Sequence, residues 1–168
     1  GEVVPGSIYR SGQLHRDLME ETLQENGVDV IVCLRPHEPD HPDHVSERAV
    51  ADRLGIEMVQ LELIGDGTGS LDHYVTAVKK IKDVSDSGQQ VLVHCAAGAY
   101  RTGVAVTFYR LLVQGEDPAT IRDELLENPT ITVAELGAVR PLEVSVNISR
   151  ENLRRYGLTI DQVARRIR

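Results

Sequence analysis

The stretch QVLVHCAAGAYRTG, residues 90–103, decides the fold. It begins with Gln90-Val91-Leu92-Val93-His94, a short apolar run typical of a buried strand. Small residues follow Cys95, and an apolar segment with a helical pattern begins at Thr102. The order of strand, tight loop and helix places Cys95 at the N-terminus of a helix, beyond the carboxyl end of a strand. Ligands bind at this position in open α/β sheets.

Strands and helices alternate along most of the chain, which indicates βαβ units. Further strands are predicted over 3–10, interrupted by a Pro5-Gly6 turn, and over 28–34 and 56–63. Helices are predicted over 14–26, 43–54, 71–87, 102–114 and 118–127, with a glycine-rich loop over 65–70. The predicted fold is α/β, with a central, mostly parallel sheet of four to five strands flanked by helices.

Cys95 and Arg101 are the residues of the central loop that carry chemistry. Small residues let the backbone curl so that successive N–H groups point inward, and such a nest at a helix N-terminus binds an anion. The same field favours a thiolate over a thiol. Arg101 closes the loop, and its planar guanidinium can chelate two phosphoryl oxygens. The spacing therefore predicts a nucleophile, an anion cradle and a charge clamp within seven residues.

The sequence His94-Cys95, five residues, Arg101-Thr102 resembles the signature of the cysteine-dependent protein tyrosine and dual-specificity phosphatases. Two further segments, 9–13 (YRSGQ) and 32–36 (VCLRP), resemble a bacterial, plant and fungal subgroup of small dual-specificity-like phosphatases. The resemblance covers roughly residues 3–128. It implies a phosphatase-like fold and the hydrolysis of phosphate monoesters.

The resemblance also implies a two-step mechanism through a phosphocysteine on Cys95. Backbone amides of the loop and the Arg101 side chain would bind the phosphoryl oxygens. The substrate-binding residues would be Ala96, Ala97, Gly98, Ala99, Tyr100 and, from another loop, Arg35. Thr102 would donate a hydrogen bond to the sulfur, and His94 would orient the loop. No metal and no cofactor are implied.

The family places its general acid on a mobile loop upstream of the cysteine. Asp66 lies 29 residues before Cys95, in the glycine-rich loop, and is the first choice. Asp72, 23 residues before Cys95, is the alternative, but it stands at a predicted helix start, where Asp is often only a cap.

The substrate class stays open at this stage. A protein tyrosine or dual-specificity phosphatase is the first expectation, and a phosphoinositide or inositol-phosphate phosphatase is the alternative. Tyr100 stands where many relatives of the subgroup carry a charged residue, and the loop contains no Lys, which disfavours highly phosphorylated inositols. Two further classes are weighed: a sulfurtransferase-like cysteine enzyme, which Asp66 and Thr102 disfavour, and a phospho-ligand binding module without turnover, which the complete loop disfavours.

Cys33 and Arg35 lie at and just beyond the end of the strand predicted over 28–34. Cys33 reads first as a core residue. In some relatives a cysteine on this strand forms a disulfide with the nucleophile, which implies Cys33 as a redox partner of Cys95. Arg35 either contributes to the pocket or pairs with a nearby acid. Residues 10, 11 and 13 (Arg, Ser, Gln) are expected to brace the site.

The segment 37–44 (HEPDHPDH) has the composition of a metal site. Its histidines are His37, His41 and His44, and its aspartates are Asp40 and Asp43. Two prolines stiffen it and no cysteine joins it, so a solvated loop that leads into a helix is the preferred interpretation.

The chain is expected to hold a phosphatase domain over 1–140 and an appendage over 141–168. Residues 141–148 alternate as a half-buried strand does, and two short helices follow. Residues 153–163 are similar to a segment of a periplasmic subdomain of resistance-nodulation-division efflux pumps. The role of this βαα appendage stays open.

The net charge is −8, from 18 Lys plus Arg and 26 Asp plus Glu. Residues 150–168 carry +4, so residues 1–149 carry −12. The acidic body disfavours nucleic acid and anionic membranes as partners, whereas a phosphorylated protein or a small phosphate monoester fits the loop. No apolar run approaches the roughly 20 residues of a membrane span, and the two cysteines indicate a reducing compartment. No signal peptide is visible, so a cytoplasmic location is expected. The first residue is Gly1, and a segment could precede it.

Overall fold

A computed structural model of the protein describes residues 1–127. The appendage predicted over 141–168 and the boundary predicted at residue 140 lie outside the described residues. No helix within residues 1–127 is both long enough and apolar enough to cross a membrane.

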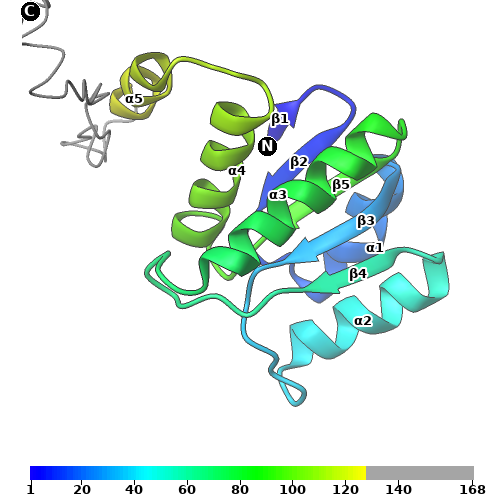
Figure 1. The fold of residues 1–168 in the computed structure, drawn as a ribbon. Coiled ribbons are helices and arrows are strands. Elements are labelled where there is room, and N and C mark those ends of the chain that lie inside the picture. The colour runs from blue at the N-terminus through cyan, green and yellow to red at the C-terminus, as the bar shows by residue number, and fades with distance from the viewer. Residues whose placement is uncertain (128–168) are drawn as a thin grey trace, which may run out of the picture. The chain divides into compact units, whose positions relative to one another are not determined.

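Five strands form one sheet in the order β1-β2-β5-β3-β4 (Figure 1). The strands are β1 (Glu2–Val4), β2 (Ile8–Ser11), β3 (Val28–Cys33), β4 (Glu57–Gln60) and β5 (Gln90–His94). β2, β5, β3 and β4 run parallel, and β1 pairs antiparallel with β2 across the predicted Pro5-Gly6 turn. The expectation of a mostly parallel sheet of four to five strands is confirmed. β5 lies at the centre, so the loop after it leaves from the middle of the carboxyl edge.

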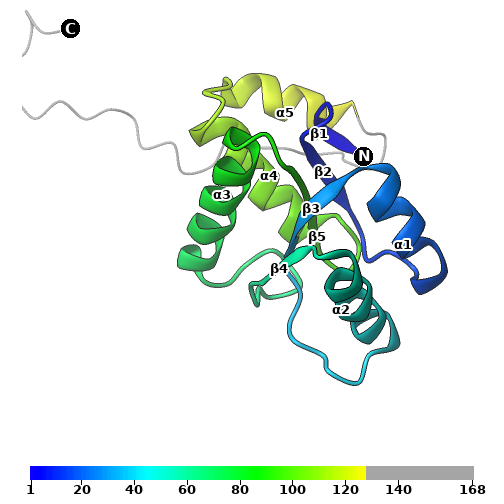
Figure 2. The same cartoon turned by 90° about the vertical axis from the view of Figure 1, so that its right-hand side faces the viewer.

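Helices cover both faces of the sheet (Figure 2). They are α1 (Arg16–Glu25), α2 (Pro42–Leu54), α3 (Leu71–Asp86), α4 (Tyr100–Leu112) and α5 (Pro118–Leu126). α1 and α2 pack on one face, and α3 and α4 pack on the other. α2 ends where predicted, because Gly55 takes the left-handed conformation (φ 71°) that a C-cap glycine supplies without strain. α4 begins at Tyr100, two residues before the predicted start.

Two apolar clusters fill the space between the sheet and the helices. Alternate residues of β3 point to opposite faces, as the period of a strand requires. Val30, Val32 and Leu34 join Cys95 in the cluster under α3 and α4. Ile31 and Cys33 join the cluster under α1 and α2.

Candidate active site

The carboxyl ends of four parallel strands form one row at the edge of the sheet. Ser11 at the end of β2 pairs with His94 at the end of β5. Cys33 at the end of β3 pairs with His94 on one side and Gln60 on the other. Cys95 is the next residue after this row. The predicted position of Cys95, beyond the end of a central strand and before a helix, is therefore the observed one.

The loop after Cys95 is packed against the segment that follows β2. Gly98 has φ +69°, and a Cβ atom built there would lie 2.6 Å from the backbone nitrogen of Gly12. The backbone N–H of Gln13 donates to the carbonyl of Ala96 (2.9 Å), and Arg10 Nη2 donates to the carbonyl of Gly98 (2.7 Å). Arg10 and Gln13 thus brace the loop, as the sequence predicted. A residue with a side chain does not fit at position 98.

Cys95 is buried, with 2% of its surface exposed. Burial by itself raises the pKa of the thiol. Hydrogen bonds from the Thr102 hydroxyl and from the backbone N–H groups of Thr102, Gly98 and Ala97 act in the opposite direction and outweigh burial. The pKa of Cys95 therefore lies below its ordinary value, and the loop stabilises an anion at the sulfur.

Arg101 lies in the first turn of α4 and is buried except for 7% of its surface. Its Nη1 atom points to the carbonyls of Leu34 and Leu63, each at 3.4 Å, which follow β3 and β4. Among residues 1–127, its Nε atom has no hydrogen-bond partner. Residues 96–100 are exposed or half-buried. The Nε donor of Arg101 and the accessible loop backbone are the groups from which an anion site would be built.

His94 connects the loop to α2. Its Nε2 atom lies 3.2 Å from Glu47 Oε1, and its Nδ1 atom lies 3.3 Å from the carbonyl of Cys95. Burial lowers the pKa of His94, but its hydrogen bonds with Cys33 and Glu47 outweigh burial and raise the pKa to about 10. Gln13 Nε2 also donates to Glu47 Oε1 (3.0 Å). The fully buried Glu47 of α2 therefore contacts both His94, which precedes the loop, and Gln13, whose backbone N–H binds the loop carbonyl of Ala96.

Asp66 lies in the loop between β4 and α3 and is exposed. The hydroxyl of Thr68 (2.6 Å) and its backbone N–H (2.9 Å) donate to Asp66 Oδ1 and lower the pKa of this carboxyl. The loop lies against the start of α4, since a Cβ atom built at Gly67 would lie 3.3 Å from Tyr100 Cβ. The Tyr74 hydroxyl fixes it from α3 by donating to the carbonyl of Gly67 (2.6 Å).

The environment of Tyr74 shows which groups share this end of the molecule. Burial raises the pKa of its hydroxyl, the Arg101 charge opposes this, and the charges of Cys95 and Asp66 add to it. These three charges are therefore close enough to one hydroxyl to act on it together. Asp72, the alternative acid, lies in the first turn of α3, where the helix dipole stabilises a carboxylate.

Two predicted substrate-binding side chains differ in their placement. Tyr100 is exposed (69%) at the start of α4, next to the loop. Arg35 is buried, donates through Nη1 to Gln13 Oε1 (2.7 Å), and forms an ion pair with Glu38. Of the two roles considered for Arg35, the structure contains the pairing with an acid.

Cys33 and Cys95 belong to different faces of the sheet. Cys33 lies in the apolar cluster under α1 and α2, and Cys95 lies in the cluster under α3 and α4. Both are buried, and neither takes part in a disulfide. Cys33 is in register with His94, the residue before Cys95, so the two cysteines lie at the ends of adjacent strands and their disulfide stays a prediction.

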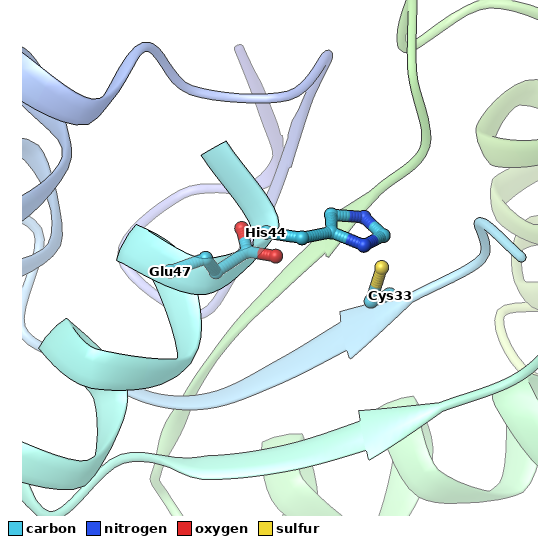
Figure 3. Close-up of side chains that lie close together, drawn as sticks. All are labelled: Cys33, His44 and Glu47. Carbon is cyan, nitrogen blue, oxygen red and sulfur yellow. The ribbon is translucent and has the colours of Figure 1, made fainter. Parts of the chain in front are cut away.

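His44 lies within the helix predicted over 43–54, but it is buried, whereas the interpretation of 37–44 expected a solvated segment. It lies on α2, is only 9% exposed, and projects toward Cys33 beside Glu47 (Figure 3). Ligand atoms of Cys33, His44 and Glu47 all lie within 4.8 Å of one another. His37 is exposed, as expected. The physical reason for the error is the fold of α2, whose early turns face the sheet.

Glu47 is the residue of this site that sequence reasoning missed. Its spacing from His44 could have indicated it. Residues three apart on a helix share a face, and His44 precedes Glu47 by three. A glutamate on the buried face of a helix needs a partner, since charged residues are almost never fully buried without one. Its partners, Gln13 and His94, are distant in sequence.

A buried cysteine beyond a central parallel strand, followed by a short loop and a helix with a buried arginine in its first turn, is the arrangement expected of the protein tyrosine and dual-specificity phosphatase superfamily. The model of a family described as DSP-PTPase phosphatase fused to NAD+ kinase matches residues 6–140. The chain belongs to this family. No curated protein matches the sequence closely enough to add to this.

Solved structures share the fold at low sequence identity. PTPMT1 has a TM-score of 0.63 and 16% identity, over 75% of this chain and 80% of that chain. The core catalytic domain of the PP-IP phosphatase SIW14 from S. cerevisiae has a TM-score of 0.61 and 24% identity, over 76% of this chain and 73% of that chain. A variant of P. aeruginosa TpbA, solved in complex with phosphotyrosine, has a TM-score of 0.57 and 21% identity, over 72% of this chain and 68% of that chain.

Proposed function

We propose that this chain hydrolyses phosphate monoesters through a phosphocysteine formed on Cys95. The observation that carries the proposal is the position of Cys95, buried between the end of β5 and the first turn of α4, with a pKa that the surrounding donors hold below its ordinary value. A buried cysteine without a function has no need of such donors, whereas a nucleophilic cysteine requires a thiolate. The sulfur attacks phosphorus, and the ester oxygen leaves.

Arg101 and the backbone N–H groups of residues 96–101 bind the phosphoryl oxygens in this proposal. Their donors are fixed before substrate arrives, so no reorganisation is needed when charge moves onto the equatorial oxygens. In the second step water attacks the phosphocysteine and the thiolate leaves. Thr102 assists that departure in this proposal, because its buried hydroxyl acts to lower the pKa of the Cys95 thiol and so stabilises the thiolate.

We propose Asp66 as the general acid of the first step and the base of the second. Its support is the position of its loop, which the Tyr74 hydroxyl holds through the Gly67 carbonyl and which lies against Tyr100, the last of the five residues between Cys95 and Arg101. The hydrogen bonds from Thr68 hold Asp66 ionised in the state described here. Catalysis therefore requires Asp66 to exchange Thr68 for the leaving oxygen, a movement that a loop with three glycines permits.

Phosphotyrosine in proteins is the substrate class that we propose first. TpbA, which shares the fold, was solved with phosphotyrosine, and SIW14 is described as a PP-IP phosphatase, so the fold accommodates both classes. The cations near the loop favour a single phosphate. Arg35 is committed to Glu38 and Gln13, Arg10 is committed to the Gly98 carbonyl, and the loop has no Lys. An inositol carrying many phosphates is the second candidate.

The first experiment is hydrolysis of an aryl phosphate by the reduced full chain, with Cys95→Ser as the inactive variant and vanadate as the inhibitor. Activity that disappears in Cys95→Ser supports the proposal. Binding of inorganic phosphate without turnover by the wild-type chain would instead identify a binding module. A panel of phosphotyrosine peptides, phosphoserine peptides, phosphoinositides and soluble inositol phosphates then ranks kcat/KM between the two substrate classes.

The general acid is assigned by comparing Asp66→Asn with Asp72→Asn. We expect Asp66→Asn to lower kcat and to remove the decline of activity at alkaline pH, because an aspartic acid that must be protonated imposes that decline. Asp72→Asn should leave both unchanged. The reverse result would move the role to Asp72.

A further inference from the structure

The side chains of Cys33, His44 and Glu47 converge on one point at the carboxyl edge of the sheet (Figure 3). Cys33 ends β3, and His44 and Glu47 project from α2 across that strand end. Their ligand atoms lie within 4.8 Å of one another. All three belong to the α1 and α2 side of the sheet, the side away from the Cys95 sulfur.

Two polar atoms of this cluster are buried without a partner. His44 Nε2 and Glu47 Oε2 make no hydrogen bond with any of residues 1–127. His44 is 91% buried and Glu47 is 99% buried, as their exposures of 9% and 1% show. An unsatisfied buried polar group is costly, and native proteins rarely leave one without a ligand, ion or water. Here two such atoms belong to side chains aimed at the same thiol.

We propose that Cys33, His44 and Glu47 form a three-ligand binding site for a zinc-type divalent cation. A thiolate, an imidazole and a carboxylate are the three ligand types that zinc takes in proteins. Zinc is bound at about 2.0–2.3 Å by such groups, which puts tetrahedral ligand atoms about 3.3–3.8 Å apart. Side-chain rotation closes the cluster to that size. The fourth position is left to water.

The surroundings of the cluster provide outer support and access. Gln13 Nε2 donates to Glu47 Oε1 at 3.0 Å, which fixes one carboxylate oxygen and leaves Oε2 for a cation. A cavity of about 700 Å³ opens beside α2, and His44 and Glu47 are among the residues that line it. Arg35 is neutralised by its ion pair with Glu38, and His94 Nε2 lies 3.2 Å from Glu47 Oε1, the same oxygen that Gln13 contacts.

Binding of the cation to this site releases a proton. The cation displaces one proton from the Cys33 thiol to solvent, and a sulfur–metal bond forms in its place. The carboxylate of Glu47 and the neutral imidazole of His44 bind without further exchange. The three ligands carry a charge of −1 before binding, from Glu47. After the proton leaves, the thiolate, the carboxylate and a divalent cation sum to zero, which suits a divalent ion better than a monovalent one.

The test uses the reduced full chain after treatment with a chelator. Co²⁺ is added as a spectroscopic substitute for Zn²⁺, and Zn²⁺ affinity is measured by competition with a chromophoric chelator. We expect one ion per chain and a thiolate-to-cobalt charge-transfer band in the near ultraviolet. The band should persist in Cys95→Ser and disappear in Cys33→Ser. Loss of the band in Cys95→Ser with retention in Cys33→Ser would overturn the proposal, because the ion would then sit on the catalytic thiolate.

His44 supplies a test that leaves both thiols in place. His44→Ala should weaken Zn²⁺ binding by more than the roughly 10- to 100-fold that the loss of an outer partner costs. His37→Ala is the matched control, because His37 lines the same cavity but lies outside the cluster, and it should bind normally. Equal affinity of wild type and His44→Ala would overturn the proposal. If Cys33→Ser fails to fold by circular dichroism, the His44 comparison decides alone.

Discussion

Gly98→Ala is the substitution that tests the loop geometry most directly. Gly98 has φ +69°, a region that residues with a side chain rarely adopt. A Cβ atom there would lie 2.6 Å from Gly12 N, 2.6 Å from Ser11 C and 2.7 Å from Ser11 O. All three neighbours are backbone atoms, and Ser11 is fixed in the ladder between β2 and β5. The contact cannot be relieved by turning a flexible side chain.

The expected cost has two parts. The left-handed conformation costs a residue with a Cβ atom about 1–2 kcal/mol. Forcing an extra carbon into a packed contact costs about 1–3 kcal/mol. Together Gly98→Ala should lower the free energy of unfolding by roughly 2–5 kcal/mol, a large share of the 5–15 kcal/mol typical of a domain. If the loop moves instead, a displacement of about 1 Å near the nucleophile lowers kcat/KM about 100-fold.

Gly88→Ala is the matched control. Gly88 has φ +76°, but a Cβ atom there meets no atom within 4 Å. It should therefore show only the conformational cost of about 1–2 kcal/mol and full activity. Urea unfolding measures the stability of both variants, and aryl phosphate hydrolysis measures their activity. Equal stability of Gly98→Ala and Gly88→Ala, with wild-type kcat/KM in both, would refute the close approach described for Gly98.

Two further substitutions test the groups around the sulfur and behind the loop. Thr102→Val removes a hydroxyl that lowers the pKa of Cys95, so the rise of kcat/KM with pH should move to higher pH, while Thr102→Ser should keep the wild-type profile; coincident profiles for all three proteins would contradict this role. Glu47→Gln leaves the buried His94 without its charged partner and should lower the free energy of unfolding by about 3–5 kcal/mol in urea. Lys80→Gln, which opens a partly exposed ion pair, should cost much less, and comparable losses would argue against the buried pair.

The order of the elements was predictable because burial leaves a strong mark on the sequence. Val91 to His94 reads as a buried strand and is one. The boundaries were less accurate where apolar residues are buried without pairing. Leu61 and Leu63 are buried beyond the end of β4, so the apolar pattern made this strand too long. α4 begins early at Tyr100 because Ala99, its N-cap, offers no side chain that marks a helix start.

The arrangement of the site residues was predictable only where it is local. Cys95, Arg101 and Thr102 lie within eight residues, so their spacing along one loop and one helix turn already fixes their relation. The bracing by Glu47 depends on the docking of α2 on the sheet. Gln13, which shares Glu47 with His94, is 34 residues away from it, and spacing along the chain carries no information about such a contact.

Cys33 lies where the sequence predicted, at the buried end of a strand. Its disulfide with Cys95 stays a prediction, because the structure holds both cysteines as free thiols. Cys33 is in register with His94, so its side chain shares a face with His94 and with α2, and Cys95 is one step further along the strand. A strand reverses its side-chain direction at each residue. That reversal places the Cys95 side chain on the α3 and α4 side and the Cys33 side chain on the α1 and α2 side, so Cys95→Ser and Cys33→Ser test the two thiols separately.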